Sequence, residues 1–197
     1  MNTRNLSLAV SAALVSLTAF AEDPSWTVVT DGSGNKTVTC YVPTGTVQGF
    51  FLYGTDGVTA SGVENGVHRL DDKVKRFIKT GAGRALMARD GALTGAQIEI
   101  QEGVVEITGR NVFGANVFVP GSGNGNICTV SDGAQLVLGF NFTTIGYQYN
   151  CIGGHCKYIL AGNGPDGNGA IFNAVTGGRQ MDAFFSDVEL TADATIG

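Results

Sequence analysis

The densest group of residues that could do chemistry is the segment Cys151-Ile-Gly-Gly-His-Cys156. Two thiols and an imidazole can bind zinc, but a structural zinc ion takes four ligands, and Cys40 and Cys128 form no second motif of this kind. The two intervening glycines permit a tight loop, and an exported chain favours disulfides. We therefore predict a Cys151–Cys156 disulfide, with free thiols and a metal site as the open alternatives.

Two further segments have the composition of cation loops. Asp31-Gly-Ser-Gly-Asn35 begins like a calcium loop, but Lys36 and Val42 stand where that loop needs a glycine and a carboxylate. The glycine-rich segment 162–169 contains Asp166 and is read as a turn, with calcium binding as the alternative. We expect no metal and no cofactor at either place.

Clustered charges provide the remaining candidates for catalysis. Glycoside-cleaving enzymes place carboxylates in one groove, often with a basic residue nearby. The spacing within each cluster here requires no catalysis, and a solvated face is the favoured reading. The two clusters comprise Asp71 and Asp72 near Lys73, Lys75 and Arg76, and Asp182 and Asp187 near Arg179.

The N-terminus has the pattern of a signal peptide. Arg4 precedes an apolar run over residues 6–17, and Ala19-Phe-Ala21 matches a small-residue cleavage site. This pattern predicts a Sec-type signal over residues 1–21, cleavage after Ala21, and a secreted or cell-surface protein. We expect no membrane span, because no later stretch is long and apolar enough.

Composition restricts the possible partners. Without residues 1–21 the chain keeps 11 of its 12 basic residues and all 17 acidic ones, for a net charge of −6. A negative balance argues against nucleic acid and against anionic membrane surfaces. Few charges and 30 glycines indicate many short strands joined by tight turns.

A 30-residue repeat of apolar positions indicates the elements that would position any functional site. Ile100, Val130, Leu160 and Leu190 are spaced by 30 residues, each with an apolar residue two positions earlier and a turn-forming residue three positions later. A fixed period of this length is typical of a solenoid whose equivalent strands stack in parallel. We predict one interior face, in stacked rows, for Ile98, Ile100, Cys128, Val130, Tyr158, Leu160, Val188 and Leu190.

The residues before the repeat are more irregular. Alternating patterns over residues 25–53 predict antiparallel strands, and we assign residues 22–75 to an N-terminal β cap and residues 76–197 to the repeats. The segment 64–77 has apolar spacings that a short amphipathic helix would show. A loop followed by a strand is the favoured reading of it.

The opening of the repeat region carries a family resemblance. Lys79-Thr-Gly-Ala-Gly83, Leu93-Thr-Gly95 and the strand-Gly-strand close around Gly103 resemble the autotransporter-associated β-strand repeat of bacterial surface proteins. The match covers residues 76–107, and Arg84 departs from the small polar residue usual there. The resemblance implies a right-handed parallel β-helix passenger displayed at a cell surface, without a catalytic residue.

These expectations define a function and its alternatives. The favoured one is a non-enzymatic scaffold, a stalk or adhesin-like segment, whose partners are surface glycans or further copies of the chain. The final repeat stops within its strand-turn-strand close, so we expect the chain to be the front of a longer protein or a truncated copy of one. Its open last strand should then self-associate by strand addition. The alternatives are a carbohydrate-active β-helix enzyme and a glycan-binding module that uses Tyr147, Tyr149 or Phe184.

Overall fold

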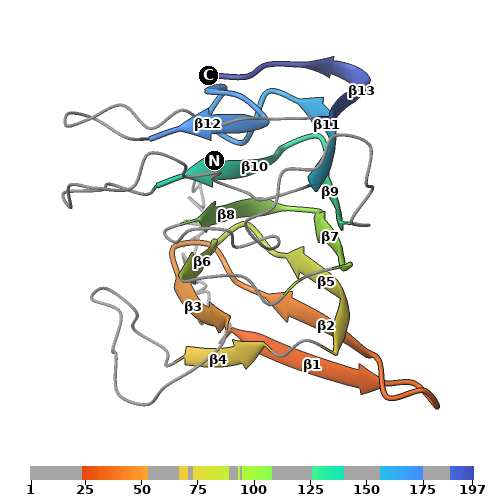
Figure 1. Ribbon diagram of the computed structural model, residues 1–197. Coiled ribbons are helices and arrows are strands. Elements are labelled where there is room, and N and C mark those ends of the chain that lie inside the picture. The colour runs from red at the N-terminus through yellow and green to blue at the C-terminus, as the bar shows by residue number, and fades with distance from the viewer. Residues whose placement is uncertain are drawn as a thin grey trace, which may run out of the picture.

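The chain forms an all-β structure, seen in a computed structural model that describes residues 24–52, 67–70, 73–88, 93, 95–107, 126–139, 156–174 and 187–197 (Figure 1). Within these ranges there is no helix, and hence none long and apolar enough to cross a membrane. The strands are β1 (Ser25–Thr30), β2 (Lys36–Tyr41), β3 (Val47–Leu52), β4 (Val67–Leu70), β5 (Val74–Thr80), β6 (Arg84–Ala88), β7 (Gln97–Ile100), β8 (Gly103–Ile107), β9 (Asn126–Val130), β10 (Ala134–Leu138), β11 (Cys156–Gly162), β12 (Ile171–Asn173) and β13 (Asp187–Ala194).

The strands form two sheets. The larger has the order β1-β2-β5-β7-β9-β11-β13, and the smaller has the order β12-β10-β8-β6-β3-β4. From β5 onwards, successive strands alternate between the two sheets, so each strand pairs with one that lies two strands away in the sequence. All pairings between described strands are parallel except that of β1 with β2.

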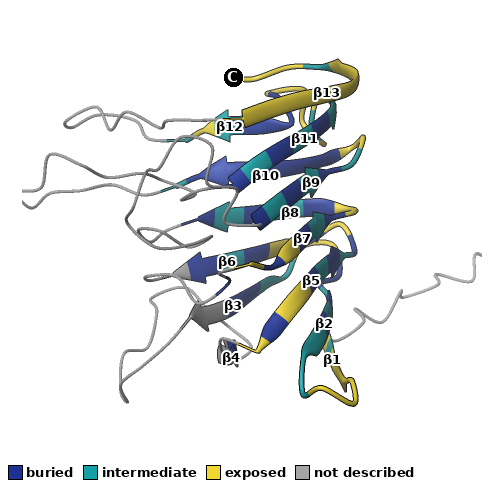
Figure 2. Cartoon of the chain, turned by 45° about the vertical axis from the view of Figure 1, so that its right-hand side comes forward, coloured by how far each residue is buried: buried dark blue, intermediate teal, exposed yellow. Residues whose placement is uncertain are grey.

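The predicted 30-residue register is confirmed. Ile100 pairs with Val130, Val130 with Leu160, and Leu160 with Leu190, and the residues two positions earlier pair in the same order. The side chains predicted to be interior on β7, β9 and β11 are at most 1% exposed. The prediction is wrong for the last strand, because Val188 is 38% and Leu190 58% exposed. Both continue their rows in register, but among the described strands β13 has a neighbour on one side only (Figure 2).

The smaller sheet supplies the opposite side of the core. Its inward positions also stack in register, with Val105 next to Leu136 and Leu136 next to Ile171. These three side chains are almost completely buried. Burial of stacked apolar rows contributes about 25 cal/mol per Å² of apolar surface removed from water, so the rows hold the two sheets together.

The N-terminal strands differ in part from their prediction. β1 and β2 form the antiparallel hairpin expected, with Trp26 opposite Cys40 and partly buried against the core. The antiparallel prediction is wrong for β3, which pairs in parallel with both β4 and β6. The physical reason is that the chain turns after β2, so β3 lies in the smaller sheet and does not pair with β2. In the larger sheet β2 pairs with β5 instead.

The segment 64–77 contains strands, so the helical alternative is wrong. Val74 and Phe77 are both buried although they are three residues apart, which an uninterrupted strand does not allow. The pairing of β2 with β5 shifts at this point: Lys36 pairs with Val74 and Thr37 with Arg76, which leaves Lys75 as an extra residue. A bulge of one residue therefore produces the helix-like spacing.

Turn glycines permit successive turns to stack closely. Gly103 has a φ of 69°, and a Cβ atom at this position would lie 2.5 Å from the carbonyl oxygen of Gly81 and 2.6 Å from that of Gly83. Both distances are too short for a side chain, so only glycine fits here. A glycine is therefore required at position 103 for a second reason besides its turn conformation, which is the close approach of the backbone at Gly81 and Gly83.

Candidate functional site

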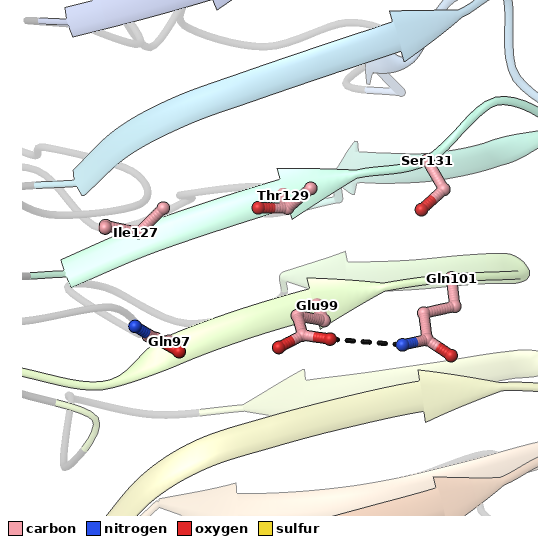
Figure 3. A pocket seen from close by; sticks show the side chains of 6 residues that line it. All are labelled: Gln97, Glu99, Gln101, Ile127, Thr129 and Ser131. Carbon is pink, nitrogen blue, oxygen red and sulfur yellow. Dashed lines mark hydrogen bonds between the residues drawn. The ribbon is translucent and has the colours of Figure 1, made fainter.

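A shallow groove of about 250 Å³ lies on the outer face of the larger sheet, between β7 and β9 (Figure 3). Alternation of side chains along a strand sends the apolar positions inward and leaves the intervening positions outside. The parallel register then sets each outward residue of β7 next to one of β9. The groove is lined by Gln97 and Glu99 of β7 with Gln101 directly after it, and by Ile127 and Thr129 of β9 with Ser131 directly after it.

Glu99 is the charged residue of this lining, and its charge is matched by a neighbour. The Arg76 side chain on β5 donates two hydrogen bonds to the carboxylate, from Nε to Oε1 at 2.6 Å and from Nη2 to Oε2 at 3.0 Å. Gln101 donates a third, from Nε2 to Oε2 at 3.1 Å. These bonds, the one from Arg76 first, hold the pKa of Glu99 below its usual value and keep the groove charge-balanced.

Ion pairs reach to the strands on both sides of the groove. Glu99 pairs with Arg76 on β5, and on the other side Lys157 on β11 pairs with Glu189 on β13, with Nζ 2.6 Å from Oε2. Thr129, half-buried, has a short side chain and provides the floor between them. The apolar pattern used to predict the repeat does not indicate this groove, whose signal is the polar half of the alternation Gln97-Ile-Glu-Ile-Gln101.

A second polar group lies inside the protein. Lys79 is fully buried, and its Nζ donates to the carbonyl oxygen of Gly81 at 2.5 Å and to that of Glu102 at 2.8 Å. The Glu102 carboxylate in turn accepts from the Gly81 amide at 3.1 Å. Burial lowers the pKa of Lys79 to about 8. The amine thus ties the turn after β5 to the turn after β7, which gives the Lys-x-Gly-x-Gly opening a structural role.

The cysteine prediction is only partly covered by the structure. Cys156 begins β11, is buried and carries a free thiol, while Cys151 lies outside the described residues, so the disulfide between them stays a prediction. Cys128 is buried at its predicted interior position. A hydrogen bond with Cys156, together with burial, raises the pKa of the Cys128 thiol well above its ordinary value and keeps it protonated and unreactive.

The two candidate cation loops are turns, as predicted. Asp31 accepts hydrogen bonds from the amides of Ser33 and Asn35 at 2.8 and 2.9 Å. Asp166 accepts from the Asn168 amide at 3.1 Å and from the buried Gln135 side chain at 3.0 Å. The second carboxylate oxygen of each aspartate accepts from a side-chain amide, that of Asn35 at 3.1 Å and that of Asn168 at 2.8 Å, so both carboxylates are engaged by protein donors.

Several sequence-level candidates lie outside the described residues. Among the described residues, no group of three or more His, Cys, Asp or Glu side chains could hold a metal ion. Residues 1–21, which contain the predicted signal peptide, are also outside the described ranges. The other candidates outside are His155, Asp71, Asp72, Arg179, Asp182, Tyr147, Tyr149 and Phe184.

Searches against protein-family models, curated proteins and solved structures find no match to the chain. The described site must therefore be interpreted from its own chemistry.

Proposed function

We propose that the chain is a non-enzymatic, secreted or surface-displayed scaffold built as a right-handed parallel β-helix, of the kind found in autotransporter passengers. The observation that carries the proposal is the unbroken register from Ile100 through Val130 and Leu160 to Leu190. Equivalent residues that pair at a constant spacing make each coil an equivalent unit, which suits a stalk whose length follows its number of coils. The buried amine of Lys79, which joins two successive turns, supports the same rigid construction.

Deletion of one whole period tests the β-helix. Removal of residues 101–130 joins Ile100 to Ser131, so that Ile100 takes the place of Val130 in the row beside Leu160. We expect the shortened chain to keep its β circular dichroism signal and a cooperative unfolding transition, because in a solenoid each coil contacts mainly its neighbours.

The matched control removes half a period. Deletion of residues 101–115 removes β8 and shortens the interval from Ile100 to Val130 from 30 residues to 15, so the chain is too short to pass through the smaller sheet before it returns to β9. We expect this variant to aggregate or unfold. Equal loss of structure in both deletion variants would contradict the proposal.

Export is proposed from the N-terminal pattern. Expression of the whole chain with a C-terminal tag should yield a mature protein whose intact mass corresponds to cleavage after Ala21, recovered outside the cytoplasm or accessible to protease on whole cells. An uncleaved cytoplasmic product would refute this part of the proposal and leave the fold untouched.

The carbohydrate-active enzyme remains the alternative. Glycoside hydrolysis uses two carboxyl groups on opposite sides of the scissile bond, one of them protonated as the acid. The lining of the described groove supplies one carboxylate, Glu99, whose pKa is lowered by Arg76. A depolymerase screen that measures released reducing ends should find no turnover, and turnover abolished by Glu99→Gln would favour the enzyme.

We also propose that β13 mediates self-association with a second copy of the chain. Its Val188 and Leu190 side chains extend two buried rows but are exposed, and β11 is its only strand neighbour among the described strands. An unpaired edge of this kind accepts a further strand. In sedimentation velocity, Leu190→Lys should dissociate the oligomer, whereas Asp193→Lys, an exposed control on the same strand, should not. A monomeric wild-type chain at high concentration would refute the interaction.

A further inference from the structure

We propose that the groove between β7 and β9 is a binding site for a neutral oligosaccharide chain. It differs from the Tyr147, Tyr149 and Phe184 surface considered from the sequence. It also goes beyond the scaffold role and does not depend on export, because the groove is formed by two paired strands and the residues that directly follow them.

The lining has the chemistry of a polyol site. The amides of Gln97 and Gln101 and the hydroxyls of Thr129 and Ser131 each provide both hydrogen-bond donors and acceptors. Sugar hydroxyls likewise donate and accept, so they can be satisfied at any of these positions. Ile127 adds an apolar surface against which the C–H face of a sugar ring can pack. A small number of polar groups around an apolar contact is the usual composition of a ligand site.

Charge favours a neutral ligand over an ionic one. Both carboxylate oxygens of Glu99 accept hydrogen bonds from Arg76, so the groove offers neither a bare anion for a cation nor an unpaired cation for an anion. A polyanion such as a nucleic acid would also meet the overall negative charge of the chain, −5.

The strand arrangement disfavours an extended peptide. Peptides that add to a sheet need a free strand edge, whereas β7 is paired with β5 and β9, and β9 with β7 and β11. The occupant must therefore be held by side chains of the sheet face. From Gln97 to Gln101 the groove extends over four residue steps, about 13 Å, which accommodates a short chain of sugar rings rather than a single ring.

The test uses the purified chain with maltohexaose, cellohexaose and mannohexaose as neutral probes and hexagalacturonate as the anionic probe, in titration calorimetry. We expect saturable binding of at least one neutral probe. Thr129→Lys, which places a long side chain on the groove floor, should weaken that binding at least tenfold. Gln97→Ala, a smaller change that should not disturb folding, should weaken it severalfold.

The matched control is Thr27→Lys, the same substitution at an exposed position of β1, the far edge of the same sheet. It should leave the affinity within twofold of the wild type, and thermal unfolding should verify that each variant is folded. The proposal is overturned if no neutral probe binds, if hexagalacturonate binds more tightly than all of them, or if both groove variants bind like the wild type.

Discussion

Lys79 carries an ammonium group at a position where burial disfavours a charge. It occupies a fully buried position in the row that contains Cys40 and Ile100, with Cys40 opposite it on β2. Burial disfavours the ammonium form, which is why the pKa of Lys79 falls from 10.5 to about 8. The amine keeps its place because two turn carbonyls accept its hydrogen bonds.

The lowered pKa of Lys79 predicts a stability that rises with pH over a narrow window. Between about pH 8 and 10.5 the unfolded chain binds more protons at this residue than the folded chain, so the free energy of unfolding increases with pH. Cys40 has the opposite effect from pH 9 upwards, because burial raises its pKa from 9.0 to about 12. We therefore expect the urea midpoint to rise between pH 8 and 9.

Lys79→Met removes the titrating group and should abolish that rise. Cys40→Ala should reduce the fall above pH 9 without removing it, because the buried Cys128 thiol also has a raised pKa. The groups that face the amine are Cys40 and the Glu102 segment, so the difference between the wild type and Lys79→Met gives the contribution of Lys79. A wild-type midpoint that falls from pH 8 to 9, or a rise that persists in Lys79→Met, would contradict the assignment.

Substitution of Gly103 should destabilise the protein in two separable ways: the new Cβ atom would contact the backbone of another turn, and the residue would keep an unfavourable φ. Gly103→Ala introduces a Cβ atom 2.5 Å from the Gly81 oxygen at a φ of 69°. Gly133→Ala is the matched control, because Gly133 has a φ of 76° but no heavy atom within 4 Å of the new Cβ. Both variants should lose about 1–2 kcal/mol from the left-handed backbone.

Only Gly103→Ala should lose a further amount, about 1–3 kcal/mol, because the preceding turn must move. Chemical denaturation of the two variants measures the difference. Equal destabilisation of both variants would show that the preceding turn can move away from the new Cβ atom without further loss of folding free energy.

At the residue scale, alternation predicted the interior positions of β7, β9 and β11 well, because apolar side chains at every second position lie on one face of the strand and that face is buried. It could not predict that Lys79 is interior, because a lysine in a strand is ordinarily solvated and its partners are carbonyls that no sequence pattern reveals. The groove is formed by the outward residues of β7 and β9, and the apolar positions that predict the core contain no information about it.

Ion pairs between strands join elements on the outer faces. Arg84 on β6 lies 2.6 Å from Glu106 on β8, and Arg84 is the residue that departs from the repeat resemblance. Both side chains are partly solvated, at 50% and 15% exposed, so water screens the pair. A double-mutant cycle of Arg84→Ala and Glu106→Ala should give a coupling of about 0.2–1 kcal/mol that decreases with added salt. A coupling above 3 kcal/mol, or one insensitive to salt, would contradict this.

The elements that sequence reasoning misjudged share a cause. β5 resembled a helix because the extra residue Lys75 shifts its pattern, and β3 appeared antiparallel because its partners β4 and β6 follow it in the sequence only after long intervals. Local periodicity predicts which residues of a strand face the core. It does not predict a bulge or the identity of a distant partner strand, because both depend on the strand with which it pairs.

Over the whole molecule, the 30-residue period holds only from Ile100 onwards. The same row begins with Cys40 and Lys79, which are separated by 39 residues, and Lys79 precedes Ile100 by 21. The upstream intervals differ in length although the strands pair in the same manner. A search for a fixed period therefore identifies the later coils and misses the earlier ones.

The register also determines how the molecule would respond to force. Hydrogen bonds between neighbouring strands point along the stack, so a force that pulls the chain away at β13 peels off this edge strand before it reaches the strands behind it. Each further strand adds about 4.8 Å to the height of the stack, yet 30 residues released as extended chain reach about 100 Å. Pulling with an atomic force microscope should therefore show successive ruptures from the β13 end, with contour increments of about 100 Å. A single rupture of the whole chain would contradict this, whereas stepwise release would make the protein a tether that lengthens under load one coil at a time and absorbs mechanical work before its far end yields.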